Sequence, residues 1–215
     1  MPASGAKGYH LTLNTDNTVD IRVVTAVTPP CSSRWWSSET EGIASETVYD
    51  IGSSTPANGI IFVKDKVWID GKIDGNRLTV LAFGDPITGN TTDIILNNDL
   101  TYTTYGGADA IGLIAQRNIT VGFYSEDNLQ IDAALIAKEG RVGRNYYYKF
   151  CGPSYIRDTI TINGSLATRN RYGFAYTDGT GYQYRKLNYD NNLTFTPPPH
   201  FPTTGEYTFI SWKEK

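Results

Sequence analysis

The sequence is poor in charge, sulfur and histidine. Only 19% of its 215 residues are charged, the formal net charge is −3, and the chain has two cysteines, two histidines and one methionine. The few basic residues form no stripe, which excludes the electrostatic footprint of a nucleic-acid-binding protein and a general patch for anionic membranes. No apolar run approaches the ~18 residues that span a bilayer.

Residues that carry catalysis are also scarce. Neither His10 nor His200 has a nucleophile motif beside it. Glycoside hydrolysis needs two carboxyl groups at ~5–9.5 Å, and Asp70 with Asp132 is one such pair to consider. These two aspartates recur at equivalent places in a repeated pattern whose other copies carry Asn, which favours a structural role. We predict no catalytic residue, no cofactor and no metal site.

The two cysteines, Cys31 and Cys151, show neither CxxC spacing nor a nearby histidine, which argues against a metal site. In an oxidising compartment they are candidates for a disulfide that joins an N-terminal segment to the later part of the chain. Two unrelated buried thiols are the alternative.

The chain has instead a short pattern that occurs four times, at residues 69–73, 96–100, 131–135 and 162–166. Each copy is an aliphatic residue, Asp or Asn, two mostly small or polar residues, and a second aliphatic residue. Recurrence at this interval is typical of a solenoid, whose coils bury their apolar face by stacking. The second residue of each copy would form a ladder at a bend of the coil. These residues are Asp70, Asn97, Asp132 and Asn163.

Short segments rich in β-branched and aromatic residues, separated by Gly and Asp turns, predict an all-β chain. We expect a parallel β-solenoid, and a β-sandwich is the alternative. Residues 1–58 would form an N-terminal β-hairpin and a connecting or capping segment, and residues 59–186 the coils. Residues 187–215 would form a proline-rich tail and a closing aromatic strand that caps the stack.

Tyrosines are concentrated in the C-terminal half of the chain. Their rings suit sugar stacking and protein interfaces, although packing within strands is the simpler interpretation. The weak candidates for ligand binding are Tyr146, Tyr147, Tyr172, Tyr176, Tyr182 and Tyr184.

Several segments occur in the same order as in a known family. They are NTV at 17–19, GIIFV at 59–63, VWIDG at 67–71, DIILNNDLTY at 93–102, GLIAQ at 112–116, QIDAAL at 130–135, GRNYY at 143–147, PPP at 197–199, FP at 201–202 and ISW at 210–212. With these the chain resembles the C-terminal regions of bacterial type IV pilus-associated, PilX-like proteins. The resemblance implies a β-helical ectodomain, and it brings no catalytic residues.

In that family the domain follows a prepilin-type N-terminal helix, which this sequence lacks. The resemblance therefore implies an extracellular or cell-surface domain that meets the membrane only through an anchor absent from this chain. We expect a non-enzymatic role in pilus assembly or adhesion, with other pilus or cell-envelope proteins, or surface glycans, as partners. The alternative is a β-helix protein that binds or cleaves polysaccharide.

Overall fold

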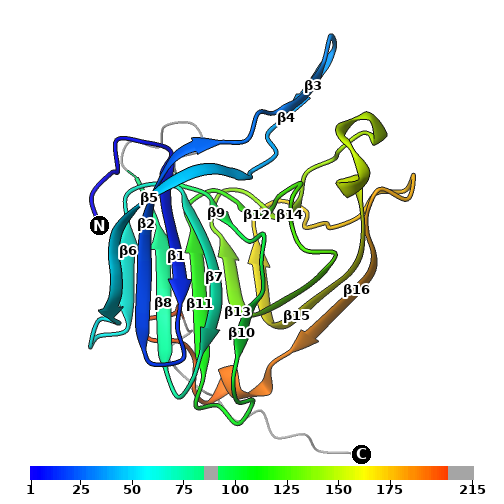
Figure 1. Ribbon diagram of the computed structural model, residues 1–215. Helices are drawn as coiled ribbons and strands as arrows, with labels where there is room; N and C mark the ends of the chain where they lie inside the picture. Colours follow the sequence, from blue (N-terminus) through cyan, green and yellow to red (C-terminus); the bar gives the residue numbers. More distant parts are fainter. Residues whose placement is uncertain (85–91, 203–215) are drawn as a thin grey trace, which may run out of the picture.

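The computed structural model describes residues 1–84 and 92–202, and the regular structure in these ranges is almost entirely β-strand (Figure 1). Sixteen strands and three short 3-10 helices occur there. The prediction of an all-β chain is confirmed. No helix in the described ranges is long and apolar enough to cross a membrane.

Fourteen of the described strands belong to one curled, mixed sheet that wraps partly around the main apolar core. At its N-terminal end, β1 (Gly8–Leu13) pairs antiparallel with β2 (Thr18–Val27), as the predicted hairpin requires. Where a connecting segment was expected, β5 (Ile43–Ser54) pairs antiparallel with β2. The sheet is therefore mixed, and the expectation that only the N-terminal hairpin departs from parallel pairing is corrected by the additional antiparallel strand β5.

The remaining strands of the sheet pair in parallel and fall into three rows. The first row contains β7 (Val67–Ile73), β10 (Leu100–Tyr102), β13 (Asn128–Ala137), β15 (Ile156–Thr168) and β16 (Gly181–Tyr189). The second contains β6 (Ile60–Val63), β8 (Arg77–Ala82), β11 (Ala110–Ala115) and the C-terminal halves of β13 and β15. The third contains the start of β7, β9 (Ile94–Ile95), β12 (Ile119–Val121) and β14 (Val142–Arg144).

Aliphatic side chains from successive strands lie over one another in the core. In the first row Leu100, Ile131 and Ile162 pair in register, and each is at most 2% exposed. The same column ends at Leu187 of β16, which is 45% exposed. Burial of these side chains stabilises the stack by about 1.5–3 kcal/mol each, and among the described residues no further strand follows Leu187 in the column.

Two glycines of the repeated pattern allow the backbones of neighbouring strands to approach. Gly164 has φ +159°, and a Cβ there would lie 1.9 Å from the carbonyl oxygen of Ala133. Gly71 has φ +105°, and its Cβ would lie 2.2 Å from the carbonyl oxygen of Leu13. Both positions therefore need glycine for its missing side chain as well as for its backbone conformation.

A small hairpin, β3 (Cys31–Ser33) with β4 (Trp36–Ser38), forms a separate two-stranded sheet that projects from the body of the protein (Figure 1). A disulfide links Cys31 to Cys151 at the end of the 3-10 helix η1 (Lys149–Cys151), with a Cα–Cα distance of 5.6 Å. A second 3-10 helix, η2 (Pro153–Tyr155), follows directly. The bond fastens the hairpin to a loop 120 residues further along the chain.

The proline-rich segment follows the 3-10 helix η3 (Asn191–Thr194) and crosses the outer face of the second row. The carbonyl oxygen of Pro197 accepts a hydrogen bond from Arg77, and that of Pro199 accepts one from Thr79. This segment was expected to cap the stack, and its described part instead covers a side of it. The expected closing strand, residues 207–212, lies outside the described residues.

Candidate functional site

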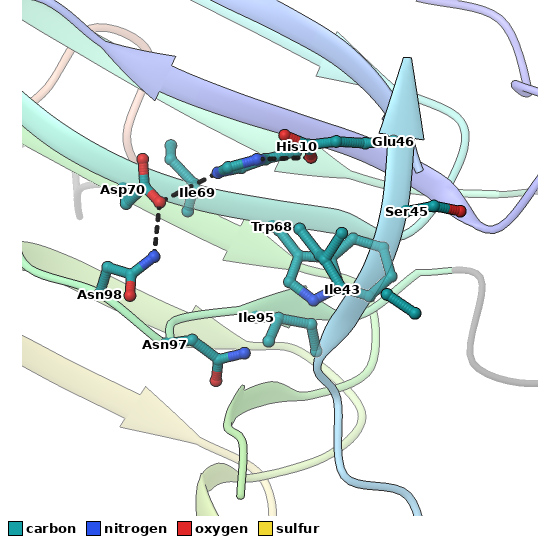
Figure 2. A pocket seen from close by; sticks show the side chains of 11 residues that line it. His10, Ile43, Ser45, Glu46, Trp68, Ile69, Asp70, Ile95, Asn97 and Asn98 are labelled. Carbon is teal, nitrogen blue, oxygen red and sulfur yellow. Dashed lines mark hydrogen bonds and ion pairs between the residues drawn. The ribbon is translucent and has the colours of Figure 1, made fainter. Parts of the chain in front are cut away.

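A groove of about 350 Å³ lies on the outer side of the sheet, between β5, β7 and the segment after β9 (Figure 2). Its apolar floor is Trp68 and Ile95, which pack with Val24 in a small second core under the curved strands β2 and β5. The indole nitrogen of Trp68 donates to the carbonyl oxygen of Glu41 at 2.9 Å. The titratable side chains of the groove lie along its polar wall.

His10 joins two carboxylates across this wall (Figure 2). It points outward from β1 because its neighbours Tyr9 and Leu11 face the core. Its Nδ1 lies 2.9 Å from Oε2 of Glu46, and its Nε2 lies 3.0 Å from Oδ2 of Asp70. The same Asp70 oxygen accepts a hydrogen bond from Asn98 at 2.8 Å.

Burial opposes the charged form of His10, but the hydrogen bonds and charges of Asp70 and Glu46 outweigh it, so the pKa of His10 is raised. Burial by itself would raise the pKa of Asp70. Hydrogen bonds from His10, Asn98 and Thr12 outweigh that effect, so the pKa of Asp70 is lowered. The arrangement therefore favours an imidazolium held between two carboxylates.

These protonation states do not suit glycoside hydrolysis. That reaction needs one carboxylic acid that stays protonated to donate to the leaving group. The pKa of Asp70 moves in the opposite direction. Both ring nitrogens of His10 are occupied, so the imidazole offers no free base to a substrate.

A second acidic contact lies nearby, between Glu126 and Asp99. Burial, followed by the charge of Asp99, raises the pKa of Glu126. Their carboxyl groups are hydrogen-bonded to each other. Two groups in direct contact are too close to flank a glycosidic bond, which needs a separation of about 5 Å or more.

Of the four residues predicted to form a ladder, Asp132 and Asn163 are joined to each other, and Asp70 and Asn97 lie elsewhere. Asp132 and Asn163 pair in register, and Nδ2 of Asn163 donates to Oδ1 of Asp132 at 2.7 Å. The ladder continues to Asn188, which donates to Oδ1 of Asn163 at 2.8 Å. Sequence reasoning missed Asn188, although its aliphatic neighbour Leu187 was a usable signal.

Asp70 and Asn97 do not join this ladder. Asp70 bonds His10 and Asn98, and Asn97 donates to the carbonyl oxygen of Glu41 at 2.7 Å. The register of the sheet explains why Asn97 lies apart from Asp132. Leu100 is the last residue of the copy at 96–100, and it pairs with Ile131, the first residue of the copy at 131–135. The two copies are therefore displaced by four residues relative to each other.

The six candidate tyrosines do not form one binding face. Tyr147 and Tyr182 are buried in the core, 1% and 0% exposed. Tyr146 and Tyr176 contact each other edge to face at 5.0 Å between ring centroids. Among the six, Tyr172 and Tyr184 are the strongly exposed members and are free to contact a ligand.

The two buried tyrosines enclose Arg144, a fully buried residue that sequence reasoning missed. Its guanidinium carbon lies 5.0 Å from the ring centroid of Tyr147 and 5.6 Å from that of Tyr182. It donates to Ser125 Oγ at 2.7 Å and to the carbonyl oxygen of Ser154 at 2.6 Å. Burial lowers the pKa of Arg144 to about 10. It serves as a structural cross-link beneath the loop of η1 and η2.

Exposed aromatic side chains gather where the β3–β4 hairpin meets that loop. The ring of Trp36 packs edge-on against Tyr148 at 4.8 Å and against Phe150 at 6.2 Å. Tyr148 is 41% exposed and Phe150 58%. At the turn of the hairpin, Trp35 is 85% exposed. Trp36, Tyr148 and Phe150 contact one another, and Trp35 is placed beside them only by its position at the turn. We call these four residues the hairpin-tip cluster, and the disulfide fastens the hairpin to the loop that carries Tyr148 and Phe150.

Within the described ranges, no group of three or more His, Cys, Asp or Glu side chains is arranged to hold a metal ion. The chain was compared with protein-family models, with curated proteins and with solved structures, and none of the three comparisons found a match.

Proposed function

We propose that the chain is a non-enzymatic, extracellular contact domain of a pilus-associated or cell-surface-anchored bacterial protein, acting in assembly or adhesion. Its partners would be other pilus or cell-envelope proteins, or surface glycans. We further propose that the parallel rows are coils of a β-solenoid, which would present the contact surface on a rigid body.

Stacking of aliphatic side chains supports the solenoid. In the second row, Ile61, Val80, Leu113, Leu135 and Leu166 succeed one another in register. A similar column runs through the third row, from Val67 to Val142. Columns of this kind are how a solenoid buries the apolar face of each coil.

An extracellular location is compatible with the disulfide between Cys31 and Cys151. Such bonds persist in oxidising compartments and are rare where thiols are kept reduced. The bond joins a projecting hairpin to a loop that contributes the rest of the aromatic surface.

The hairpin-tip cluster is the single observation that carries the contact role. Exposed Trp and Tyr rings form the centres of many interfaces and stack on sugar rings, because one ring offers a large apolar face at little entropic cost. Trp35 is 85% exposed although tryptophan is usually buried. A side chain of this kind at a turn held by a disulfide is well placed to reach a partner.

Binding of the purified, labelled chain to isolated bacterial cell envelopes and to a glycan array tests the proposal. We expect Trp35→Ala to weaken binding by about tenfold, the usual effect of removing an aromatic hot spot. The matched control is Phe195→Ala, because Phe195 is also 85% exposed but lies elsewhere.

Two outcomes would contradict the proposal. Equal binding by wild type and Trp35→Ala would remove the hairpin-tip cluster as the contact surface. Release of reducing sugar from any bound polysaccharide would establish the enzymatic alternative and direct attention to the carboxylates of the groove.

A further inference from the structure

A second hollow, of about 870 Å³, lies beside β16, the last described strand of the first row. Three arginines line it: Arg141 before β14, Arg171 after β15, and Arg185 on β16. Of the residues within 1–84 and 92–202 that line it, none is acidic. This local positive charge stands out on a chain whose formal net charge is −3.

The three guanidinium groups lack ion-pair partners within the described part of the chain. Arg141 donates to the carbonyl oxygen of Arg144 at 3.0 Å and to Oδ1 of Asn145 at 3.1 Å. Arg185 donates to the carbonyl oxygens of Tyr182 and Gln183 at 2.6 and 3.0 Å. These neutral acceptors orient Arg141 and Arg185 and leave the charge of both available to an anion.

Asp178, which directly follows the lining residue Thr177, has partners of its own. Its Oδ2 accepts a hydrogen bond from the hydroxyl of Tyr146 at 2.6 Å, and its Oδ1 accepts bonds from the backbone and side chain of Thr180. It is not among the residues that line the hollow.

The position of Arg185 argues against a second copy of the chain at this end. Arg185 pairs with Ile160, which faces the core and is fully buried, so Arg185 occupies an inward-facing position of the last described strand. Another coil stacked on it would bury a guanidinium without a counter-charge, which is strongly unfavourable. An anionic ligand would supply that counter-charge.

The tyrosine rings that line the hollow beside the arginines indicate which class of anion it would bind. Tyr172, 48% exposed, and Tyr176 line the hollow together with Leu187. Aromatic faces stack on pyranose rings, and guanidinium groups bind carboxylate or sulfate in bidentate geometry. The volume is in the range of sites that hold a few sugar rings.

We propose that this hollow binds an acidic saccharide, one whose sugar rings carry carboxylate or sulfate groups. The inference adds a site to the contact role proposed above and does not use the hairpin-tip cluster. Three confined arginines on an acidic chain fit a short charged oligosaccharide better than a nucleic acid or an anionic membrane, both of which need an extended basic surface.

Isothermal titration of the full chain tests the proposal with an oligogalacturonide as the carboxylated probe and a heparin oligosaccharide as the sulfated one. A neutral galactan oligosaccharide, single-stranded DNA and phosphatidylglycerol vesicles complete the set. Arg171→Gln and Arg185→Gln are the variants, and both sites are exposed, so folding should persist. Lys186→Gln is the control, because Lys186 is adjacent to Arg185 but points to the other face of β16.

We expect one of the two charged saccharides to bind, and the neutral one to bind at least about tenfold more weakly. Each arginine variant should lose about tenfold in affinity, as expected for one charge-assisted contact, and the control should stay within about twofold. Failure of both charged saccharides to bind, or unchanged affinity in the arginine variants, would overturn the proposal. Tighter binding of DNA or vesicles would reassign the hollow to those partners.

Trp35→Ala separates this inference from the proposed function. If the hollow alone binds acidic saccharide, Trp35→Ala should leave that titration unchanged. Loss of envelope binding in Trp35→Ala together with no saccharide binding in wild type would retain the proposed function and refute only the site at the hollow.

Discussion

The ring of His10 on β1 lies 3.0 Å from the carboxylate of Asp70 on β7, and so joins the N-terminal hairpin to the first row of parallel strands. Glu46 on β5 holds the other ring nitrogen at 2.9 Å. Three strands distant in sequence thus meet at one titratable side chain, and stability should depend on its protonation.

The pKa of His10 is raised above its ordinary value of 6.5, so its contribution to stability is fully present below pH 6.5 and is lost as pH rises through the folded-state pKa. The pKa of Asp70 is lowered from 3.8, so its contribution is present above pH 3.8 and is lost as pH falls through its folded-state pKa. His10→Gln should therefore cost about 1 kcal/mol near pH 6 and progressively less at alkaline pH.

Urea unfolding of wild type and His10→Gln between pH 4 and pH 9 measures this difference in the free energy of unfolding. His200→Asn is the control, because His200 is exposed and has φ +54°, a conformation that Asn tolerates. A difference between wild type and His10→Gln that does not change with pH would contradict the assigned protonation.

Replacement of Arg144 by Met should destabilise the protein by about 2–4 kcal/mol, because the buried acceptors it satisfies would lose their donor. These acceptors include Ser125 Oγ and the carbonyl oxygens of Phe123 and Ser154. Urea unfolding measures the loss. Arg169→Met is the exposed control, expected within about 0.5 kcal/mol of wild type, and an equally small effect at Arg144 would show that the arginine is dispensable.

Gly164→Ala should cost about 2 kcal/mol or more, since the added Cβ cannot fit beside the carbonyl oxygen of Ala133 without moving a strand. Gly106→Ala is the matched control, because a Cβ at Gly106 meets no atom within 4 Å. Thermal unfolding of both variants measures the contrast. Equal melting temperatures would mean that the close approach of β13 and β15 is not required.

Loss of the disulfide should free the β3–β4 hairpin and lower the free energy of unfolding. The bond spans 120 residues, for which chain entropy gives an upper limit of about 4–5 kcal/mol. Replacing both Cys31 and Cys151 by Ser should lower the melting temperature and speed proteolysis within the hairpin. Cleavage at the same rate as in the oxidised wild type would show that other contacts hold the hairpin.

The repeated pattern shows how far sequence reasoning reached into the candidate site. It aligned Asp132 with Asn163, and the structure joins the two by a hydrogen bond of 2.7 Å, although both lie within strands, β13 and β15, and not at the predicted bend. It could not place Asn97, because an aliphatic residue at both ends of each copy permits two registers that differ by four residues. The alignment of Leu100 with Ile131 depends on contacts between strands that are remote in sequence.

The tyrosines illustrate a second limit. Tyr147 and Tyr172 belong to the same residue type and the same half of the chain, yet one is 1% and the other 48% exposed. Exposure depends on which strand, loop or neighbouring side chain lies over a residue. Tyr147 is covered because Arg144 and Phe123 pack against it.

By itself, the sequence determined the all-β class and the N-terminal hairpin, because alternation of side chains and turn residues are local properties. Only the tertiary structure decided that Cys31 bonds Cys151, that β2 and β5 make the sheet mixed, and that His10 lies between Glu46 and Asp70. It also brought Arg141, Arg171 and Arg185 to one hollow. Each of these arrangements depends on the register of distant strands, which is set by the packing of the whole core.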